Sequence, residues 1–125
     1  MIVLTVEQLL ELHALVIAET GGSEGLRDLG RLEAVVAAQT QVIFGKELYS
    51  GMFEKAAALL RGIIADHAFV DGNKRTAMLC ALTFLDLNGA TVVAAEGEIE
   101  DFAVRVAVEQ LDVPHITTWL EKHCS

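Results

Sequence analysis

The stretch MFEKAAALLRGIIADHAFVDGNKRTAMLCALTFLDL, residues 52–87, decides the fold. It holds two apolar runs, and between them lies the charged nonapeptide HAFVDGNKR, residues 67–75. Apolar side chains nearly all round a helix are typical of helices buried at the centre of a bundle. The stretch therefore predicts two central helices, over about 52–66 and 73–88, with the polar nonapeptide connecting them.

Helix signals continue on both sides of this stretch. Thr5 and Gln8 have the spacing of a capping box, and they open a helix that ends at Gly21. Further helices are expected over about 28–39, over about 96–111 and from Pro114 towards the C-terminus. Segment 40–51 has few helix signals and is predicted to be a connection with some extended structure. The sequence thus predicts an all-α fold, a single domain over residues 1–125 with about six helices.

The composition fits one domain with a substantial core. The chain has 125 residues, of which 53% are hydrophobic, and a domain near this size buries roughly two-thirds of its unfolded surface. Nine Lys and Arg oppose 18 Asp and Glu, for a net charge of −9. This balance argues against nucleic acid and against anionic membranes as partners, because both attract a basic face.

Location and cysteine chemistry are expected to be simple. No apolar run reaches the roughly 18 residues of a membrane span, and the N-terminus lacks the pattern of a signal peptide. These features predict a cytoplasmic protein. Cys80 is expected in the core and Cys124 at the frayed chain end, with a disulfide as the lesser alternative. Neither has the spacing of a zinc ligand.

The nonapeptide carries the chemistry of phosphate binding. A helix that begins at Asn73 presents amide N–H groups without intrahelical partners, together with the positive end of its dipole. Gly72 lets an anion approach the backbone, and Lys74 and Arg75 add charge-assisted donors. These residues together predict a phosphate site.

Asp71 and His67 extend this site to catalysis. Asp71 would repel phosphate unless a divalent cation lies between them, and Mg²⁺ binds one or two carboxylates together with phosphate oxygens. His67 is the neutral-pH base nearby that can take a proton from an attacking hydroxyl. Each residue alone has a common structural explanation, such as an Asp-Gly turn. Their concentration between two buried helices favours the functional interpretation, with Phe69 anchoring the loop in the core.

The nonapeptide resembles the signature of the Fic/Doc superfamily, His-x-Phe-x-(Asp/Glu)-Gly-Asn-(Gly/Lys)-Arg. The match is closest to the Doc branch, where the signature ends in Asn-Lys-Arg-Thr-Ala, as residues 73–77 do. Segments 31–33, 44–49 and 54–57 also look like Doc, so the resemblance covers nearly the whole chain. It implies a Fic/Doc-type bundle with the catalytic loop between two buried central helices, in a prokaryotic toxin of the Phd–Doc toxin–antitoxin type.

The resemblance also implies a role for each residue of the loop. His67 is the expected catalytic base, and Lys74 and Arg75 are the other expected catalytic groups. Asp71 is the expected Mg²⁺ ligand. The residues implied in binding the phosphates of the substrate ATP are Gly72, Asn73, Lys74 and Arg75.

Two positions bear on the reaction. Fic proteins typically transfer AMP, and they carry Gly after the Asn and a second Arg three residues beyond the first, where this chain has Lys74 and Met78. The Doc resemblance implies a reversed nucleotide that presents its γ-phosphate, hence a kinase for Ser or Thr. Its implied target is a threonine of elongation factor Tu, which arrests translation. AMP transfer and a non-catalytic partner-binding module are the alternatives.

The implied partner is a Phd-like antitoxin whose disordered tail folds in the active-site groove. Lys46 and Tyr49 lie where the family has a substrate-positioning flap. Asp66 is expected to pair with a cation or to orient His67, and Arg61 is expected to reach either the nucleotide or a buried acid.

The other histidines are expected to be structural. His13 lies on the inner face of its helix, whereas His115 and His123 are expected on the surface. Trp119 is expected to be a packing residue. Histidines scattered in this way do not indicate a zinc site.

Overall fold

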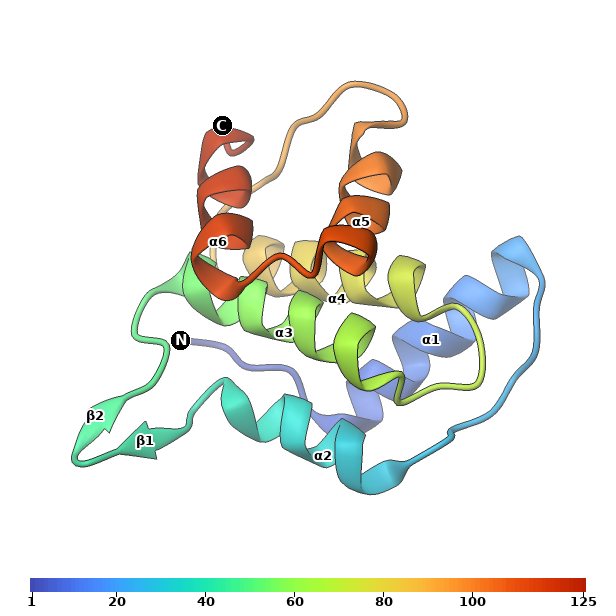
Figure 1. Ribbon diagram of the computed structural model, residues 1–125, viewed down its shortest axis with the longest axis horizontal. Coiled ribbons are helices and arrows are strands. Elements are labelled where there is room, and N and C mark those ends of the chain that lie inside the picture. Colours follow the sequence, from blue (N-terminus) through green and yellow to red (C-terminus); the bar gives the residue numbers. More distant parts are fainter.

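Two antiparallel helices, α3 (Met52–Asp66) and α4 (Asn73–Leu87), occupy the centre of the computed structural model, which describes residues 1–125 (Figure 1). Their contact is the most extensive between any two elements. Both helices carry apolar side chains that are almost wholly buried, among them Leu59, Leu60, Ile63, Cys80, Ala81 and Phe84. The stretch 52–87 therefore forms the core, as the sequence predicts, and Cys80 is part of it.

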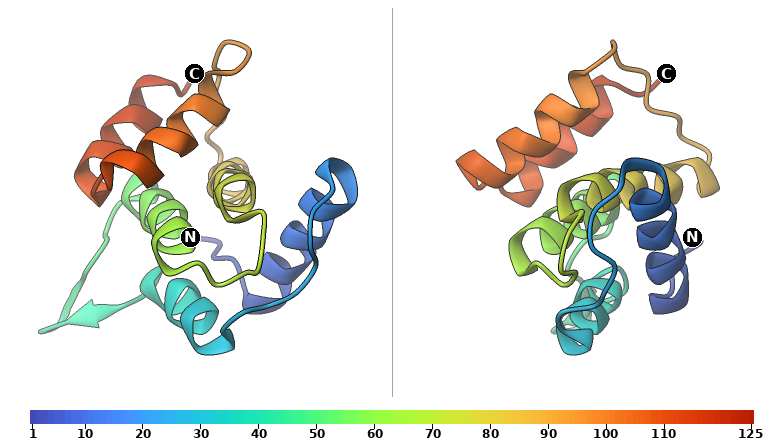
Figure 2. Two further views of the ribbon diagram at one scale, coloured as in Figure 1. Left: turned by 45° about the vertical axis from the view of Figure 1, so that its right-hand side comes forward. Right: turned by 90° about the vertical axis from the view of Figure 1, so that its right-hand side faces the viewer.

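Four further helices cover this central pair. α1 (Val6–Thr20) packs on α4, and α2 (Leu29–Ala38) packs on α3. α5 (Glu98–Glu109) and α6 (Val113–Lys122) cover the opposite side (Figure 2). The expected all-α bundle of about six helices is confirmed, although α5 begins and ends two residues inside the predicted range 96–111. None of the helices combines the length and the apolarity that crossing a bilayer requires.

Local signals set the ends of the helices. The Thr5 side chain accepts a hydrogen bond from the Gln8 amide at 3.2 Å, and the Gln8 side chain accepts one from the Thr5 amide at 2.9 Å. This is the expected capping box. Asp28 and Asp112 cap α2 and α6 in the same manner through their carboxylates.

The leucines at the end of α4 are not all buried, although the apolar run predicts a buried helix over about 73–88. Leu85 is fully buried, whereas Leu87 is 43% exposed, and Leu79 and Leu82 are half-buried. Two residues along a helix turn the side chain by roughly 200°. Leu87 therefore points to the face opposite Leu85, where no helix covers it.

A small hairpin interrupts the helices. β1 (Val42–Ile43) pairs antiparallel with β2 (Lys46–Glu47), and the turn residues Phe44 and Gly45 both have positive φ. The extended structure expected in segment 40–51 is thus present. The hairpin projects from the N-terminal end of α3, whereas His67 follows its C-terminal end (Figure 1). A helix of 15 residues, about 22 Å long, lies between them.

Stacked aromatic rings hold α6 on α5. Trp119 stacks on Phe102, with 4.2 Å between ring centroids, and His123 stacks on Trp119 at 3.9 Å. The ring nitrogens of His123 lie 2.7 Å from two acceptors, the carbonyl oxygen of Trp119 and the carboxylate of Glu98. Both nitrogens can donate only in the imidazolium form. Trp119 is thus a packing residue, but the expectation of a surface His123 is wrong, because this stack half-buries the ring.

These contacts make the α5–α6 pair sensitive to pH. The Trp119 carbonyl, and after it the Glu98 carboxylate, raise the pKa of His123 above its usual value. Because the folded protein holds the His123 proton more tightly than the unfolded chain does, protonation of His123 stabilises the fold. This stabilisation is complete below the pKa of the unfolded chain, about 6.5, and is lost as pH rises through the folded-state pKa.

We expect His123→Ala to remove this dependence. The difference in melting temperature between wild type and His123→Ala should be largest near pH 6 and should shrink by pH 9. Thr118→Ala serves as a control, because Thr118 is exposed on the same helix α6 and carries no titratable group. A difference that stays constant with pH would contradict the assignment.

Candidate active site

His67 lies at the C-terminus of α3 in a left-handed backbone conformation, with φ 47° and ψ 52°. This conformation is uncommon for a residue other than Gly and ends the helix sharply. The chain then turns towards α4, and the imidazole of His67 is exposed. The base that the sequence predicts therefore sits on a backbone that the surrounding structure must hold in place.

The loop is held from within by Asn73. Its side-chain oxygen accepts a hydrogen bond from the Phe69 amide at 3.1 Å, and its side-chain nitrogen donates to the Phe69 carbonyl at 2.9 Å. The Phe69 ring is fully buried, as expected of an anchor. The Asn73 side chain thus closes the loop, and its backbone N–H is the group that remains for the expected anion.

Residues 25–28 hold the loop from outside. The amides of Arg27 and Asp28 donate to the Ala68 carbonyl at 2.7 and 3.2 Å, and the Val70 amide donates to the Gly25 carbonyl at 3.1 Å. Leu26 and Phe69 form an antiparallel bridge here. A segment some forty residues away thus pairs with the loop, and no local pattern in the sequence indicates this pairing.

His13 contributes a third support that the sequence did not assign. Its ring stacks on Phe69, with 3.9 Å between centroids and 5° between planes. Its Nε2 lies 2.8 Å from the Asp71 carbonyl oxygen, and since a carbonyl only accepts, Nε2–H is the donor. The expectation of a core histidine is correct but incomplete. The sequence did contain a signal for this role: His13 lies in the apolar stripe of its helix, and a buried histidine needs a hydrogen-bond partner.

The Asp71 carboxylate is oriented by two backbone amides. It accepts hydrogen bonds from Ser23 N–H at 3.2 Å and Gly72 N–H at 2.8 Å. The Ser23 amide, and next the Gly72 amide, lower the pKa of Asp71. His13 and Arg75 lower it further by their charge. The side chain is therefore an ionised, exposed carboxylate in a fixed orientation at neutral pH.

The Asp71 carboxylate could supply one ligand of a magnesium ion whose other ligands would come from outside the protein. No three His, Cys, Asp or Glu side chains come together as a metal-binding group. One carboxylate leaves the other positions of an octahedral ion to phosphate oxygens and water, which is how Mg²⁺ usually binds at nucleotide sites. Asp71 would hold the ion there, and the ion would offset phosphate charge.

The N-terminus of α4 presents free donors beside Asp71. No side chain caps this helix, so the amides of Asn73, Lys74 and Arg75 have no partner within the protein. Gly72 has φ 75°, and a Cβ there would lie 3.1 Å from Ile17 Cδ1, which leaves little room for any other residue. The free amides and the helix dipole together favour an anion at this position.

A hollow of about 180 Å³ brings these groups together. Its walls contain five of the predicted site residues: His67, Asp71, Gly72, Asn73 and Lys74. Arg75, the sixth, is exposed and close enough to act on the charge of Asp71, but it does not line this hollow. The structure therefore places Lys74 at the anion position and Arg75 at its edge.

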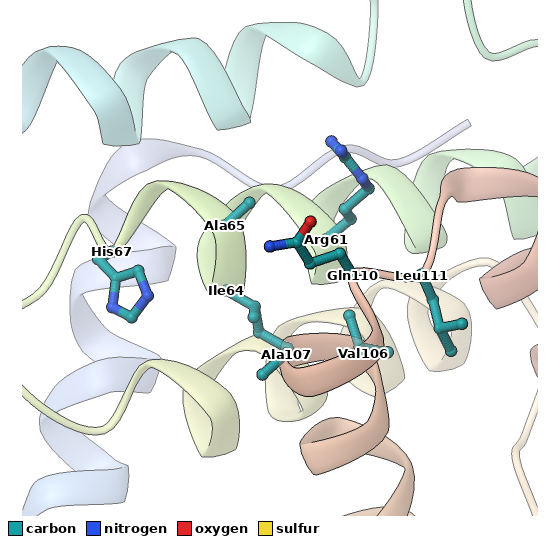
Figure 3. Close-up of a pocket in the computed structure, with 8 residues that line it drawn as sticks. All are labelled: Arg61, Ile64, Ala65, His67, Val106, Ala107, Gln110 and Leu111. Carbon is teal, nitrogen blue, oxygen red and sulfur yellow. The ribbon is translucent and has the colours of Figure 1, made fainter.

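A second, larger cavity of about 330 Å³ adjoins the first (Figure 3). It lies between the C-terminal halves of α3 and α5. His67, Ile64 and Ala107 line both cavities, so His67 stands where they meet. The sequence did not predict this cavity, because it requires the packing of α5 against α3.

Three other candidate residues lie away from the anion position. Met78 is 3% exposed and buried in the core, so it offers nothing to a phosphate. The Asp66 carboxylate has neither of its expected partners; its backbone carbonyl instead accepts from Arg31 at 2.8 Å. Lys46 belongs to the hairpin at the far end of α3, which keeps the hairpin outside the site.

Comparison with known proteins establishes the family. Residues 3–85 match the family model described as Fic/DOC family. The chain is 41% identical over 103 residues to "Toxin Doc" of Mycolicibacterium smegmatis, covering 80% of this chain and 78% of that protein. It is 34% identical over 116 residues to "Protein kinase doc" of Escherichia phage P1, covering 93% and 90%. The chain belongs to the Fic/DOC family, and the expected likeness to its Doc toxins is confirmed.

We expect Asn73→Ala to loosen the loop. Removing the side chain leaves the Phe69 N–H and C=O without partners, which should lower the free energy of unfolding by about 1–3 kcal/mol in urea titrations. Hydrogen exchange of the Phe69 amide should accelerate, because Asn73 is its acceptor.

Asn88→Ala is the matched control. Asn88 makes the same pair of hydrogen bonds, to the backbone of Ile2, beyond the other end of α4. This variant should accelerate exchange at Ile2 and leave Phe69 unchanged. Unaltered hydrogen exchange at the Phe69 amide in Asn73→Ala would show that the two hydrogen bonds of Asn73 do not hold the loop.

Proposed function

We propose that the protein is a toxin that transfers the γ-phosphate of ATP to a Ser or Thr hydroxyl of a target protein. The observation that carries this proposal is the position of Lys74, in one hollow with His67 and Asp71 at the uncapped end of α4. Met78, where an AMP-transferring protein of the superfamily is expected to have a second Arg, is buried. The phage P1 relative is named a protein kinase, which supports the same reaction.

The proposed step needs one base and one phosphate site. His67 takes the proton of the acceptor hydroxyl as its oxygen forms a bond to the γ-phosphorus. The bond from that phosphorus to the β,γ-bridging oxygen breaks, and ADP leaves with the electron pair. Lys74 and the free amides of α4 stabilise the charge on the transferred group. Asp71 would hold Mg²⁺ against the phosphates, and Arg75 would bind a phosphate at the edge of the hollow.

The proposed partners follow from the relatives. A relative named as a Doc toxin supports an antitoxin that covers this site, and we propose a Phd-like protein in that role. We propose a threonine of elongation factor Tu as the acceptor, so that translation stops. AMP transfer is the second candidate, because a phosphate site of this kind would suit the transfer of either a γ-phosphate or an AMP group. A non-catalytic binding module is disfavoured, since it has no need of an oriented Asp71 and an exposed His67.

Labelled ATP separates the two reactions. Purified protein is incubated with elongation factor Tu and Mg²⁺, and with either γ-labelled or α-labelled ATP. We expect label in elongation factor Tu from the γ-position alone. Label from the α-position alone would overturn phosphate transfer and establish AMP transfer. No label from either, together with no ATP binding by calorimetry, would establish the non-catalytic alternative.

We expect His67→Ala to lower the transfer rate by about 10²–10⁴-fold, the usual contribution of a general base, while ATP binding changes little. Lys74→Ala should weaken ATP binding about tenfold or more, because a charge-assisted contact is lost. His115→Ala is the matched control, since His115 is exposed on α6 and lines neither cavity. Full activity in His67→Ala would remove this residue as the base.

A further inference from the structure

The larger of the two adjoining cavities has no role in the phosphate chemistry described above. Hydrophobic residues line it from both helices, among them Ile64 of α3 and Val106, Ala107 and Leu111 of α5 and its end. Three polar residues also line it, namely Arg61, Gln110 and His67. A cavity of about 330 Å³ with this mixture is typical of a binding site for a small group or a side chain.

Arg61 is an unpaired cation in this cavity. No carboxylate lies within 4 Å of its guanidinium, and the same holds for Lys74 and Arg75. Six of the nine Lys and Arg residues have no carboxylate within 4 Å, and three of these six, Arg61, Lys74 and Arg75, lie at or beside the two cavities. An occupant that carries a carboxylate would form an ion pair with the guanidinium of Arg61.

The backbone supports the same location. Only three residues other than Gly have positive φ, namely Phe44, His67 and Gln110. Two of these, His67 and Gln110, line this one cavity from opposite helices. Each of the two ends its helix, α3 or α5, in this conformation, so the C-terminal ends of these helices meet at the cavity.

The occupant must be placed relative to His67, which both cavities share. A base in phosphate transfer contacts the attacking hydroxyl, and the attacking and leaving oxygens lie on opposite sides of the phosphorus. With the γ-phosphate in the hollow beside Lys74, the hydroxyl approaches His67 from the other cavity. A nucleotide that filled both cavities would instead lie across His67 and keep the hydroxyl away.

We propose that the larger cavity is the acceptor subsite. It receives a segment of the target protein that has a large aliphatic side chain next to the reacting Ser or Thr and a carboxylate within a few residues. The aliphatic side chain packs on Ile64, Val106 and Leu111, and the carboxylate pairs with Arg61. This assignment rests on the proposed phosphate transfer and names the acceptor class for it.

Kinetics with the two substrates test this assignment. The acceptor is total protein of a bacterial lysate with γ-labelled ATP, so the test does not depend on which protein is modified. We expect Arg61→Ala to raise the half-saturating acceptor concentration about tenfold, the loss of one charge-assisted contact, with the KM for ATP unchanged. Arg61→Lys should restore most of the loss. Lys122→Ala is the control, being another cation without a carboxylate within 4 Å, on α6.

A second variant fills the cavity without touching the core. Ala65 is exposed and lines only this cavity, so Ala65→Trp should also impair the acceptor alone. Ala18→Trp, at an exposed position of α1, controls for the added ring. Circular dichroism and calorimetry with ATP verify that each variant folds and binds nucleotide.

The outcomes separate the inference from the proposed function. If wild type labels no lysate protein, both fail. If wild type transfers phosphate but Arg61→Ala and Ala65→Trp weaken ATP binding, the cavity belongs to the nucleotide and the inference is overturned. If neither substrate is affected by either variant, the cavity has no part in the reaction, and phosphate transfer stands without it.

Discussion

The closure of Asn73 on the backbone of Phe69 is the interaction on which the site depends. The Asn73 carboxamide accepts a hydrogen bond from the Phe69 N–H and donates one to the Phe69 C=O. These two bonds fix the backbone where the buried Phe69 ring joins the exposed loop. The ring is then pressed between the core and the imidazole of His13, which also holds the Asp71 carbonyl. A polar loop between two apolar helices is stable because the hydrogen bonds of Asn73 and His13 satisfy backbone groups of the loop, and the ring stack of His13 packs on Phe69.

That closure has an electrostatic consequence. Because Asn73 binds Phe69 and Gly72 has no side chain, nothing in the protein caps α4, and its first amides stay free. The Asp71 carboxylate is turned aside by the amides of Ser23 and Gly72, so it stands next to the anion position without occupying it. In an otherwise acidic protein the free amides of α4 and the cations Lys74 and Arg75 thus lie together at one helix end, which favours an anionic ligand there.

Much of the helical fold could be predicted from local signals. The capping box at Thr5, the cap at Asp28 and the apolar runs of 52–87 act over a few residues, and each appears where expected. The exceptions share a cause. Leu87 is exposed and His123 is stacked because their surroundings are set by other helices, and a helix pattern reports periodicity but not which face is covered.

The sequence by itself determined the residues of the loop and their order, since the whole motif lies within nine consecutive positions. It also determined that two buried helices flank this loop. Only the tertiary structure decided that the Asn73 side chain serves the loop while Lys74 faces the hollow, that His13 and residues 25–28 support the loop, and that α5 closes a second cavity against His67. The physical reason is sequence separation: contacts between residues forty or more apart depend on how helices pack, and local patterns carry no record of it.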